Sequence, residues 1–213
     1  LFMLGAVFSF AVLTEFLGAD SPSATNYALL LLVLLLTMLF GALVNTSIER
    51  LAYRRLRNAP KLAPLITAVG MSFVLQWIGL KWIGSNPVNV NTVLPSTSFE
   101  LAGVVINFKT LIIFAITIPL LIVLAFIVNK TKRGRAMRAT AQDKDASRLM
   151  GIDVNKTITF TFAIAGAAAG AAGIMWAQTT GTVAYNLGFQ LGLIAFTSAV
   201  LGGVGNLYGA VLG

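Results

Sequence analysis

Residues 27–48 read YALLLLVLLLTMLFGALVNTSI, and this apolar stretch decides the fold. A helix needs about 20 apolar residues to cross the hydrocarbon core of a bilayer, so the stretch is long enough to span a membrane. Other apolar runs lie on both sides of it, at residues 1–17, 62–83, 109–128, 157–179 and, more briefly, 188–200. The sequence therefore predicts an all-α fold, a polytopic bundle of transmembrane helices that forms a single domain over residues 1–213.

The composition supports a membrane location and excludes several kinds of chemistry. Hydrophobic residues make up 57% of the chain and charged residues 10%, and the mean hydropathy is +0.87. A soluble domain carries about 25% charged residues, so this chain cannot cover a water-exposed surface. There are no cysteines and no histidines. Thiol catalysis, disulfides, a zinc site and imidazole acid–base chemistry are thereby excluded, and we expect no catalytic residues and no metal.

Most basic residues lie in two loops, and they predict the orientation of the chain. Residues 49–61 hold five Lys and Arg, and residues 129–156 hold eight, which is 13 of the 15 in the chain. Two spanning runs separate these loops, so both lie on one side, and the positive-inside rule makes that side the cytoplasm. Residues 18–26, 84–108 and 181–186 then face outward. Aromatic residues are not interleaved with the basic ones, so nucleic-acid binding is not expected.

The second basic loop carries an amphipathic pattern. Positive charge alone would be enough to orient the chain, so this pattern points to a further role. Residues 135–150 predict one helix that ends at Gly151, with small and apolar residues along one side. That side consists of Ala136, Ala139, Thr140, Ala146, Leu149 and Met150. Such a helix suits a groove on a cytoplasmic partner. The alternative is an interfacial helix on lipid headgroups, which the lack of Trp and Phe disfavours.

Glycines mark two further features. Gly166, Gly170 and Gly173 share one apolar run, and small residues four apart let helices approach closely, so we assign them to helix packing. Gly202, Gly203 and Gly205 follow the run at 188–200, which rises only about 20 Å against a core of about 30 Å. We therefore expect a half-helix that breaks within the membrane. No Lys-Ser or Lys-Thr pair follows these glycines, so a phosphate-binding loop is rejected.

Smaller signals concern the outer segment and the polar residues within the runs. Two β-prone pieces flank residues 102–103 and predict a small hairpin within residues 99–108. Six uncharged polar side chains could line a substrate path or make interhelical hydrogen bonds. They are Asn45, Ser72, Gln76, Gln178, Thr197 and Ser198. Glu15 is the one acidic residue well within a run, and we expect it near the outer interface, so the lack of buried carboxylates argues against an ion-coupled carrier.

Three stretches resemble the permeases of branched-chain amino acid ABC transporters, and the likeness is greatest to the LivH-like subunit. They are residues 47–76 (SIERLAYRRLRNAPKLAPLITAVGMSFVLQ), 133–152 (RGRAMRATAQDKDASRLMGI) and 199–209 (AVLGGVGNLYG). The resemblance runs over nearly the whole chain, in order and spacing. Members of this family carry further spanning segments at both ends, so we expect the domain to be truncated at both ends.

The resemblance implies a multi-pass permease of the bacterial inner membrane that catalyses no reaction itself. Its implied partners are a sibling permease, two cytoplasmic ATPase subunits that use ATP, and an external substrate-binding protein. Its implied cargo is leucine, isoleucine or valine, carried by alternating access. The implied ATPase-coupling residues are Arg135, Arg138, Ala139, Ala141, Asp143, Ala146, Gly151 and Ile152. ABC importers generally have Glu-Ala-Ala where this chain has Ala139-Thr140-Ala141. The alternatives are an ABC permease for urea, amides or sugars and, less favoured, an ion-coupled secondary carrier.

Overall fold

Long apolar helices dominate the computed structural model, which describes residues 1–13, 24–56, 59–60, 62–90, 98–101, 104–203, 205 and 207–212. The four long helices are α2 (Ala24–Ile48), α3 (Leu62–Ile83), α4 (Phe108–Lys130) and α7 (Val154–Thr180). Within the described residues, four helices have the length and composition to cross a membrane. The predicted all-α membrane fold is thus confirmed.

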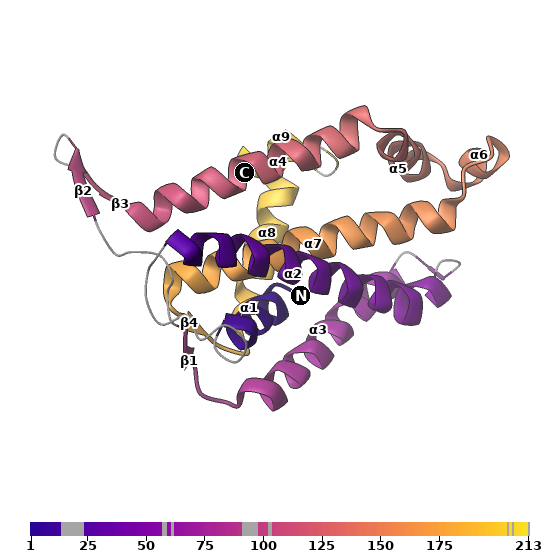
Figure 1. Cartoon of the computed structure of the whole chain (residues 1–213). Coiled ribbons are helices and arrows are strands. Elements are labelled where there is room, and N and C mark those ends of the chain that lie inside the picture. The colour runs from indigo at the N-terminus through magenta and orange to yellow at the C-terminus, as the bar shows by residue number, and fades with distance from the viewer. Residues whose placement is uncertain are drawn as a thin grey trace.

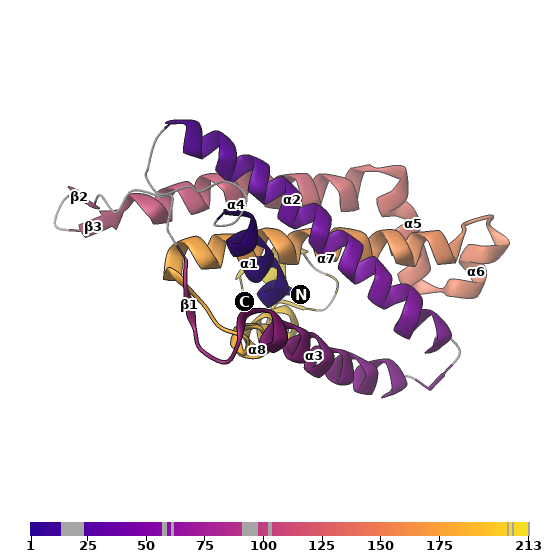
Figure 2. The same ribbon diagram turned by 60° about the horizontal axis from the view of Figure 1, so that its bottom comes forward.

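Shorter helices complete the bundle. They are α1 (Phe2–Ala11), α5 (Lys132–Gln142), α6 (Lys144–Leu149), α8 (Leu187–Leu201) and α9 (Leu207–Leu212). Figure 1 shows α2 and α7 side by side through the middle of the molecule, with α4 on one side and α3 on the other. Figure 2 shows the same pair crossing at an angle, with α1 beside them. The α2–α7 pair is therefore the centre of the fold.

Close backbone approach holds this central pair together. A Cβ added at Gly166 of α7 would overlap the carbonyl oxygen of Gly41 on α2, and one at Gly170 would overlap that of Thr37. On a third turn of α7, Gly173 lies against the backbone of α1 at Phe2. Only glycine leaves room for such contacts, which bring helix backbones within reach of each other's carbonyl groups.

Apolar side chains fill two clusters on either side of the glycine contacts. One consists of Leu13, Leu30, Val33, Leu34, Ala171 and Ile174. The other consists of Met3, Leu4, Ala6, Val7, Val90, Ala177 and Val183. By contrast, no residue of α4 is buried, and its apolar side chains such as Phe114 and Phe126 face outward. That exposure suits lipid tails, which are as apolar as these side chains.

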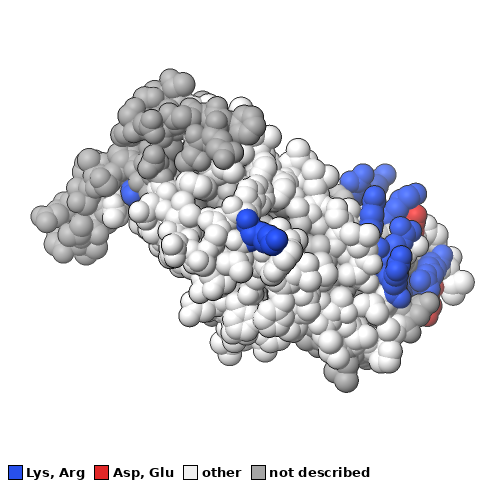
Figure 3. Space-filling model, turned by 90° about the horizontal axis from the view of Figure 1, so that it is seen from below, with Lys and Arg blue, Asp and Glu red and all other residues white. Residues whose placement is uncertain are grey.

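Two small antiparallel sheets lie at the end of the bundle opposite to α5 and α6 (Figure 1). The strands β2 (Ser98–Leu101) and β3 (Val104–Asn107) pair with Ser98 opposite Asn107, which confirms the predicted hairpin. The strands β1 (Val88–Asn89) and β4 (Thr182–Val183) join segments far apart in the sequence. Lys and Arg gather at one end of the face in Figure 3. We call the end that carries α5, α6 and the first turns of α7 the basic end.

The predicted break after α8 is also confirmed. The helix ends at Leu201, and Gly203 and Gly205 have φ of +93° and +99°, conformations that favour glycine. The chain then enters α9, and the Ser198 hydroxyl donates a hydrogen bond to the Ala210 carbonyl at 3.1 Å. At Gly202 a Cβ would overlap the backbone of Gly209. The two helices therefore lie against each other across a tight turn.

Two sequence-based boundaries were wrong. The loop expected from residue 49 is helical as far as Leu56, first as the π-helical turn η2 (Glu49–Tyr53) and then as the 3₁₀ turn η3 (Arg54–Leu56). The single helix expected over residues 135–150 is two helices, because Asp143 has extended backbone angles (φ −151°, ψ 117°). Its carboxylate accepts hydrogen bonds from the backbone N–H groups of Asp145 and Ala146 and so starts α6 afresh.

Candidate functional site

A cavity of about 310 Å³ opens between α2, α3 and α8. Three of the six polar residues proposed for a substrate path line it, namely Asn45, Ser72 and Gln76. Most of the other lining residues are apolar: Leu1, Met3, Ile48, Ala68, Met71, Leu75, Phe162, Gly188, Phe189, Gly192 and Leu193, beside Tyr53. A largely apolar cavity with a few polar groups is the usual form of a small-molecule site, and this volume lies at the lower end of that range.

The three polar side chains in the cavity differ in how they are held. Asn45 is buried, and its amide donates a hydrogen bond of 2.7 Å to the Phe162 carbonyl, which links α2 to α7. The Ser72 hydroxyl donates to the Val69 carbonyl of its own helix at 2.7 Å. Within the described residues, Gln76 has no hydrogen-bond partner. Gln76 is therefore the side chain in this cavity whose donors and acceptor remain available to a ligand.

The other three path candidates lie elsewhere. Gln178 is buried beside Leu30, Ile112 and Met175, between α2, α4 and α7. Thr197 is exposed and donates to the Ile194 carbonyl at 2.8 Å, while Ser198 makes the bond to Ala210 described above. The structure thus brings together half of the six predicted residues and separates the rest.

Two residues of this region were missed by the sequence analysis. Glu49 is fully buried and accepts a hydrogen bond of 2.9 Å from the Thr159 hydroxyl, so it ties the π-helical turn to α7. Tyr53 lines the cavity and contacts the Phe162 ring, with 5.2 Å between ring centroids. Both fall in the segment expected to be a solvated loop. An acidic residue directly after an apolar run was the available signal for Glu49.

The residues predicted to couple to an ATPase surround α5 and α6. Four of them, Ala139, Asp143, Ala146 and Ile152, line a groove between these helices together with Gln142, Ser147 and Met150. Leu149 and Met150 are 89% and 83% exposed at its edge. Gly151 has φ +80°, which turns the chain back toward α7.

The remaining coupling candidates do not line the groove. Arg135 and Ala141 are exposed on α5, and the Arg138 guanidinium donates to the Val128 carbonyl at the end of α4. That contact fastens α5 to the spanning helix before it. No cluster of metal-ligating side chains occurs in the described parts of the chain.

Spanning helices around a small, largely apolar cavity with a few polar groups, and an exposed helical pair at one end, are typical of a multi-pass membrane transport protein. The family model described as the permease component of the branched-chain amino acid transport system matches residues 1–213, and the chain belongs to this family. It is therefore a permease, a transport component and not an enzyme. No solved structure matches the chain.

Curated relatives agree with this assignment. The chain is 35% identical to the high-affinity branched-chain amino acid transport system permease protein BraD of Pseudomonas aeruginosa, over all of this chain and 70% of BraD. It is 32% identical to LivH of Salmonella typhimurium with the same coverage. It also resembles LsrC, an autoinducer 2 import system permease of Enterobacter sp., with 33% identity over 66% of this chain and 40% of LsrC.

Proposed function

We propose that this permease forms part of the path by which an ATP-driven importer carries branched-chain amino acids across a bacterial inner membrane. The observation that carries the proposal is the cavity between α2, α3 and α8, in a chain whose full-length relatives BraD and LivH are named for this transport. The proposed partners are a sibling permease, two ATPase subunits and an external binding protein.

The chemistry of the cavity suits an aliphatic amino acid. Met71, Leu75 and Leu193 offer apolar surface to a branched side chain, and Gln76 offers hydrogen bonds to the amino and carboxylate groups. No Asp, Glu, Lys or Arg side chain lines it in the described structure. A zwitterion carries no net charge, so a neutral lining can bind it without holding it too tightly for release.

The cargo site is tested by replacing Gln76 with leucine, which keeps the size of the side chain and removes its hydrogen bonds. One lost hydrogen bond is worth about 1 kcal/mol, or about a fivefold change in affinity. We expect Gln76→Leu to raise the KM for uptake of radiolabelled leucine about fivefold in cells that express the whole importer.

The matched control is Gln190→Leu, because Gln190 is exposed on α8 and does not line the cavity. It should leave uptake unchanged. If the two variants transport leucine with the same KM, the cavity is not the cargo site. Competition by urea, small amides and sugars in the same assay tests the alternative cargoes.

We further propose that the groove between α5 and α6 receives an ATPase subunit in the cytoplasm. Its small lining residues let a partner side chain sit deep, and the exposed Leu149 and Met150 lose water contact when a partner covers them. Movement of the ATPase would then reach α4 through Arg138 and α7 through the turn at Gly151.

Ala146→Glu tests the docking proposal. A carboxylate without a partner in this interface costs about 3–5 kcal/mol, so we expect the variant to reach the membrane and lose both ATPase co-purification and uptake. Asn129→Glu adds the same charge at the exposed end of α4, away from the groove, and should retain both. Normal uptake by Ala146→Glu with the ATPase still bound would contradict the docking site.

A further inference from the structure

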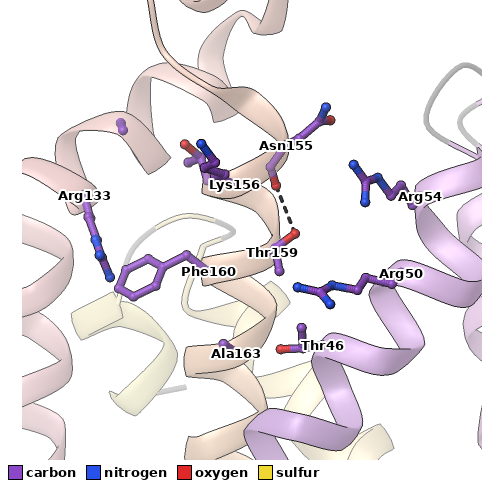
Figure 4. A pocket seen from close by; sticks show the side chains of 11 residues that line it. Thr46, Arg50, Arg54, Arg133, Asn155, Lys156, Thr159, Phe160 and Ala163 are labelled. Atoms are coloured by element: carbon purple, nitrogen blue, oxygen red, sulfur yellow. Dashed lines mark hydrogen bonds between the residues drawn. The ribbon is translucent and has the colours of Figure 1, made fainter.

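A second cavity, of about 520 Å³, lies at the basic end between the end of α2, the start of α5 and the first turns of α7 (Figure 4). Four cationic side chains line it: Arg50, Arg54, Arg133 and Lys156. They approach from opposite sides of α7, with Arg133 on one side and Arg50 and Arg54 on the other. No acidic side chain lines this cavity in the described structure.

Two of these cations are already engaged and two are not. Lys156 pairs with the Asp153 carboxylate at 3.2 Å, and Arg133 stacks on the Phe160 ring at 4.6 Å. Hydrogen bonds from the Lys156 backbone N–H, and then from its ammonium, lower the pKa of Asp153. Among the described residues, Arg50 and Arg54 have neither a hydrogen bond nor an ion pair. The cavity therefore holds two guanidinium groups whose charge is uncompensated.

The π-helical turn fixes the position of these guanidinium groups. Glu49 is fully buried against α7 through Thr159, and Arg50 directly follows it in the chain. Burial of Glu49 therefore sets the rotation of the turn, and Arg50 points from it toward α7 (Figure 4). π-helical turns occur mostly as single turns and frequently at functional sites.

Along α7 the lining becomes apolar with depth, while Thr46 of α2 adds a hydroxyl at the level of Ala163. Phe160 and Ala163 follow Lys156 along α7, and Ala163 lies about 10 Å further from the basic end than Lys156 at 1.5 Å per residue. Ala136 of α5 adds apolar surface on the other wall. A free anion needs only the cationic rim, whereas a phospholipid places its phosphate there and its glycerol and first methylenes against the apolar part.

We propose that this cavity binds the headgroup phosphate of an anionic phospholipid, with Arg50 and Arg54 as its main ligands. Basic pockets between membrane helices suit such headgroups, and guanidinium groups bind phosphate oxygens in pairs. The bound lipid bridges α2, α5 and α7, so it couples the basic end of the central pair to α5. The proposal does not depend on which cargo the permease carries.

Native mass spectrometry of the detergent-purified full-length permease tests the proposal. The probes are phosphatidylglycerol, phosphatidylcholine with the same acyl chains, and inorganic phosphate. We expect phosphatidylglycerol to bind at least tenfold more tightly than phosphatidylcholine. We also expect millimolar phosphate not to displace it. Displacement by phosphate would identify a free-anion site and overturn the lipid assignment.

Two sets of variants distinguish a built site from general attraction to a basic surface. Arg50→Gln with Arg54→Gln should weaken phosphatidylglycerol binding at least tenfold. Arg55→Gln with Lys144→Gln removes the same charge from exposed residues outside the cavity and should change binding less than twofold. Equal loss in both pairs would overturn the proposal.

A variant that keeps every charge provides a second test in case the arginine variants misfold. Ala136→Trp fills the cavity from α5 and leaves every cation in place. It should abolish the preference for phosphatidylglycerol over phosphatidylcholine, and retention of that preference in the monodisperse variant would place the lipid elsewhere. If the preference appears only when the ATPase is absent, the arginines serve an acidic surface of that partner, and the lipid site is refuted.

Discussion

Single glycines set the distance between the two central helices. Gly41 and Gly166 face each other, and a Cβ on either would overlap the other's carbonyl oxygen. Gly170 repeats the contact one turn later against Thr37. Larger residues at these points would force the helices apart, and the apolar cluster around Val33 and Ile174 would lose contacts along the whole seam.

Gly166→Ala should therefore destabilise the permease although alanine is the better helix former. Overpacking a tight contact costs about 1–3 kcal/mol, which exceeds the gain of about 1 kcal/mol in helix propensity. We expect a lower thermal unfolding temperature in detergent. Gly70→Ala is the control, because a Cβ at Gly70 meets nothing within 4 Å and should leave stability unchanged or slightly raised. Equal unfolding temperatures would show that the seam tolerates a methyl group.

At this scale the sequence could identify residue types but not their neighbours. The small-residue spacing pointed to Gly166 and Gly170, and the structure supplies their partner surface on α2. The polar residues show the limit. Asn45 and Gln76 share a cavity and Gln178 does not, because the packing of α2, α3 and α7 fixes the rotation of each helix about its own axis.

At the scale of elements, one aspartate divides the segment proposed for coupling. The amphipathic pattern continues through residues 135–150, so periodicity alone predicts one helix. Asp143 ends it locally, because an aspartate side chain can satisfy the free N–H groups of a new helix start. The side-chain carboxylate and the preceding helix compete for the same backbone N–H groups. Hydrophobic periodicity does not indicate which of them binds these groups.

Asp143→Ala should loosen α6 without unfolding the bundle. Its carboxylate accepts from Asp145 N–H at 2.8 Å and Ala146 N–H at 3.1 Å, and loss of an N-cap costs about 0.5–2 kcal/mol. Amide hydrogen exchange over residues 144–149 should accelerate several-fold, while exchange in α7 stays unchanged. Asp143→Asn keeps a capping oxygen and should restore protection. Unchanged exchange in Asp143→Ala would show that other contacts hold α6.

At the scale of the whole molecule, hydropathy predicted the helical architecture well. The four long helices were expected from their apolar runs, and α3 has the very bounds of its run. Two runs hold short helices: α8 covers fifteen residues, as its brief run predicts, and α1 covers ten in the described part of its run. Hydropathy indicates whether a segment lies in a membrane, but not whether it crosses the membrane. The positions of the short helices therefore depend on their contacts with other helices, which the sequence does not show.

The orientation of the bundle can be tested with single cysteines, because the chain has none of its own. The variants Arg55→Cys and Met150→Cys each place a cysteine at an exposed position of the basic end. Asn86→Cys places one at an exposed position of the opposite end. The positive-inside rule predicts that an impermeant maleimide labels intact cells at Asn86→Cys alone. The other two should react only after permeabilisation. Rapid labelling of Met150→Cys from outside would show that the predicted orientation is wrong.

The glycine seam also has a mechanical consequence. Helix α7 has 27 residues, which makes a rod about 40 Å long, and the seam clamps it to α2. Because the helix is held at the seam and does not bend there, α7 tilts about the seam as a rigid body. The seam lies about 20 Å from each tip, so a tilt of about 5° about it moves the two tips by about 2 Å in opposite directions. A small movement near Val154 would thus reach the other tip, beside β1 and β4, with the opposite direction and a similar size.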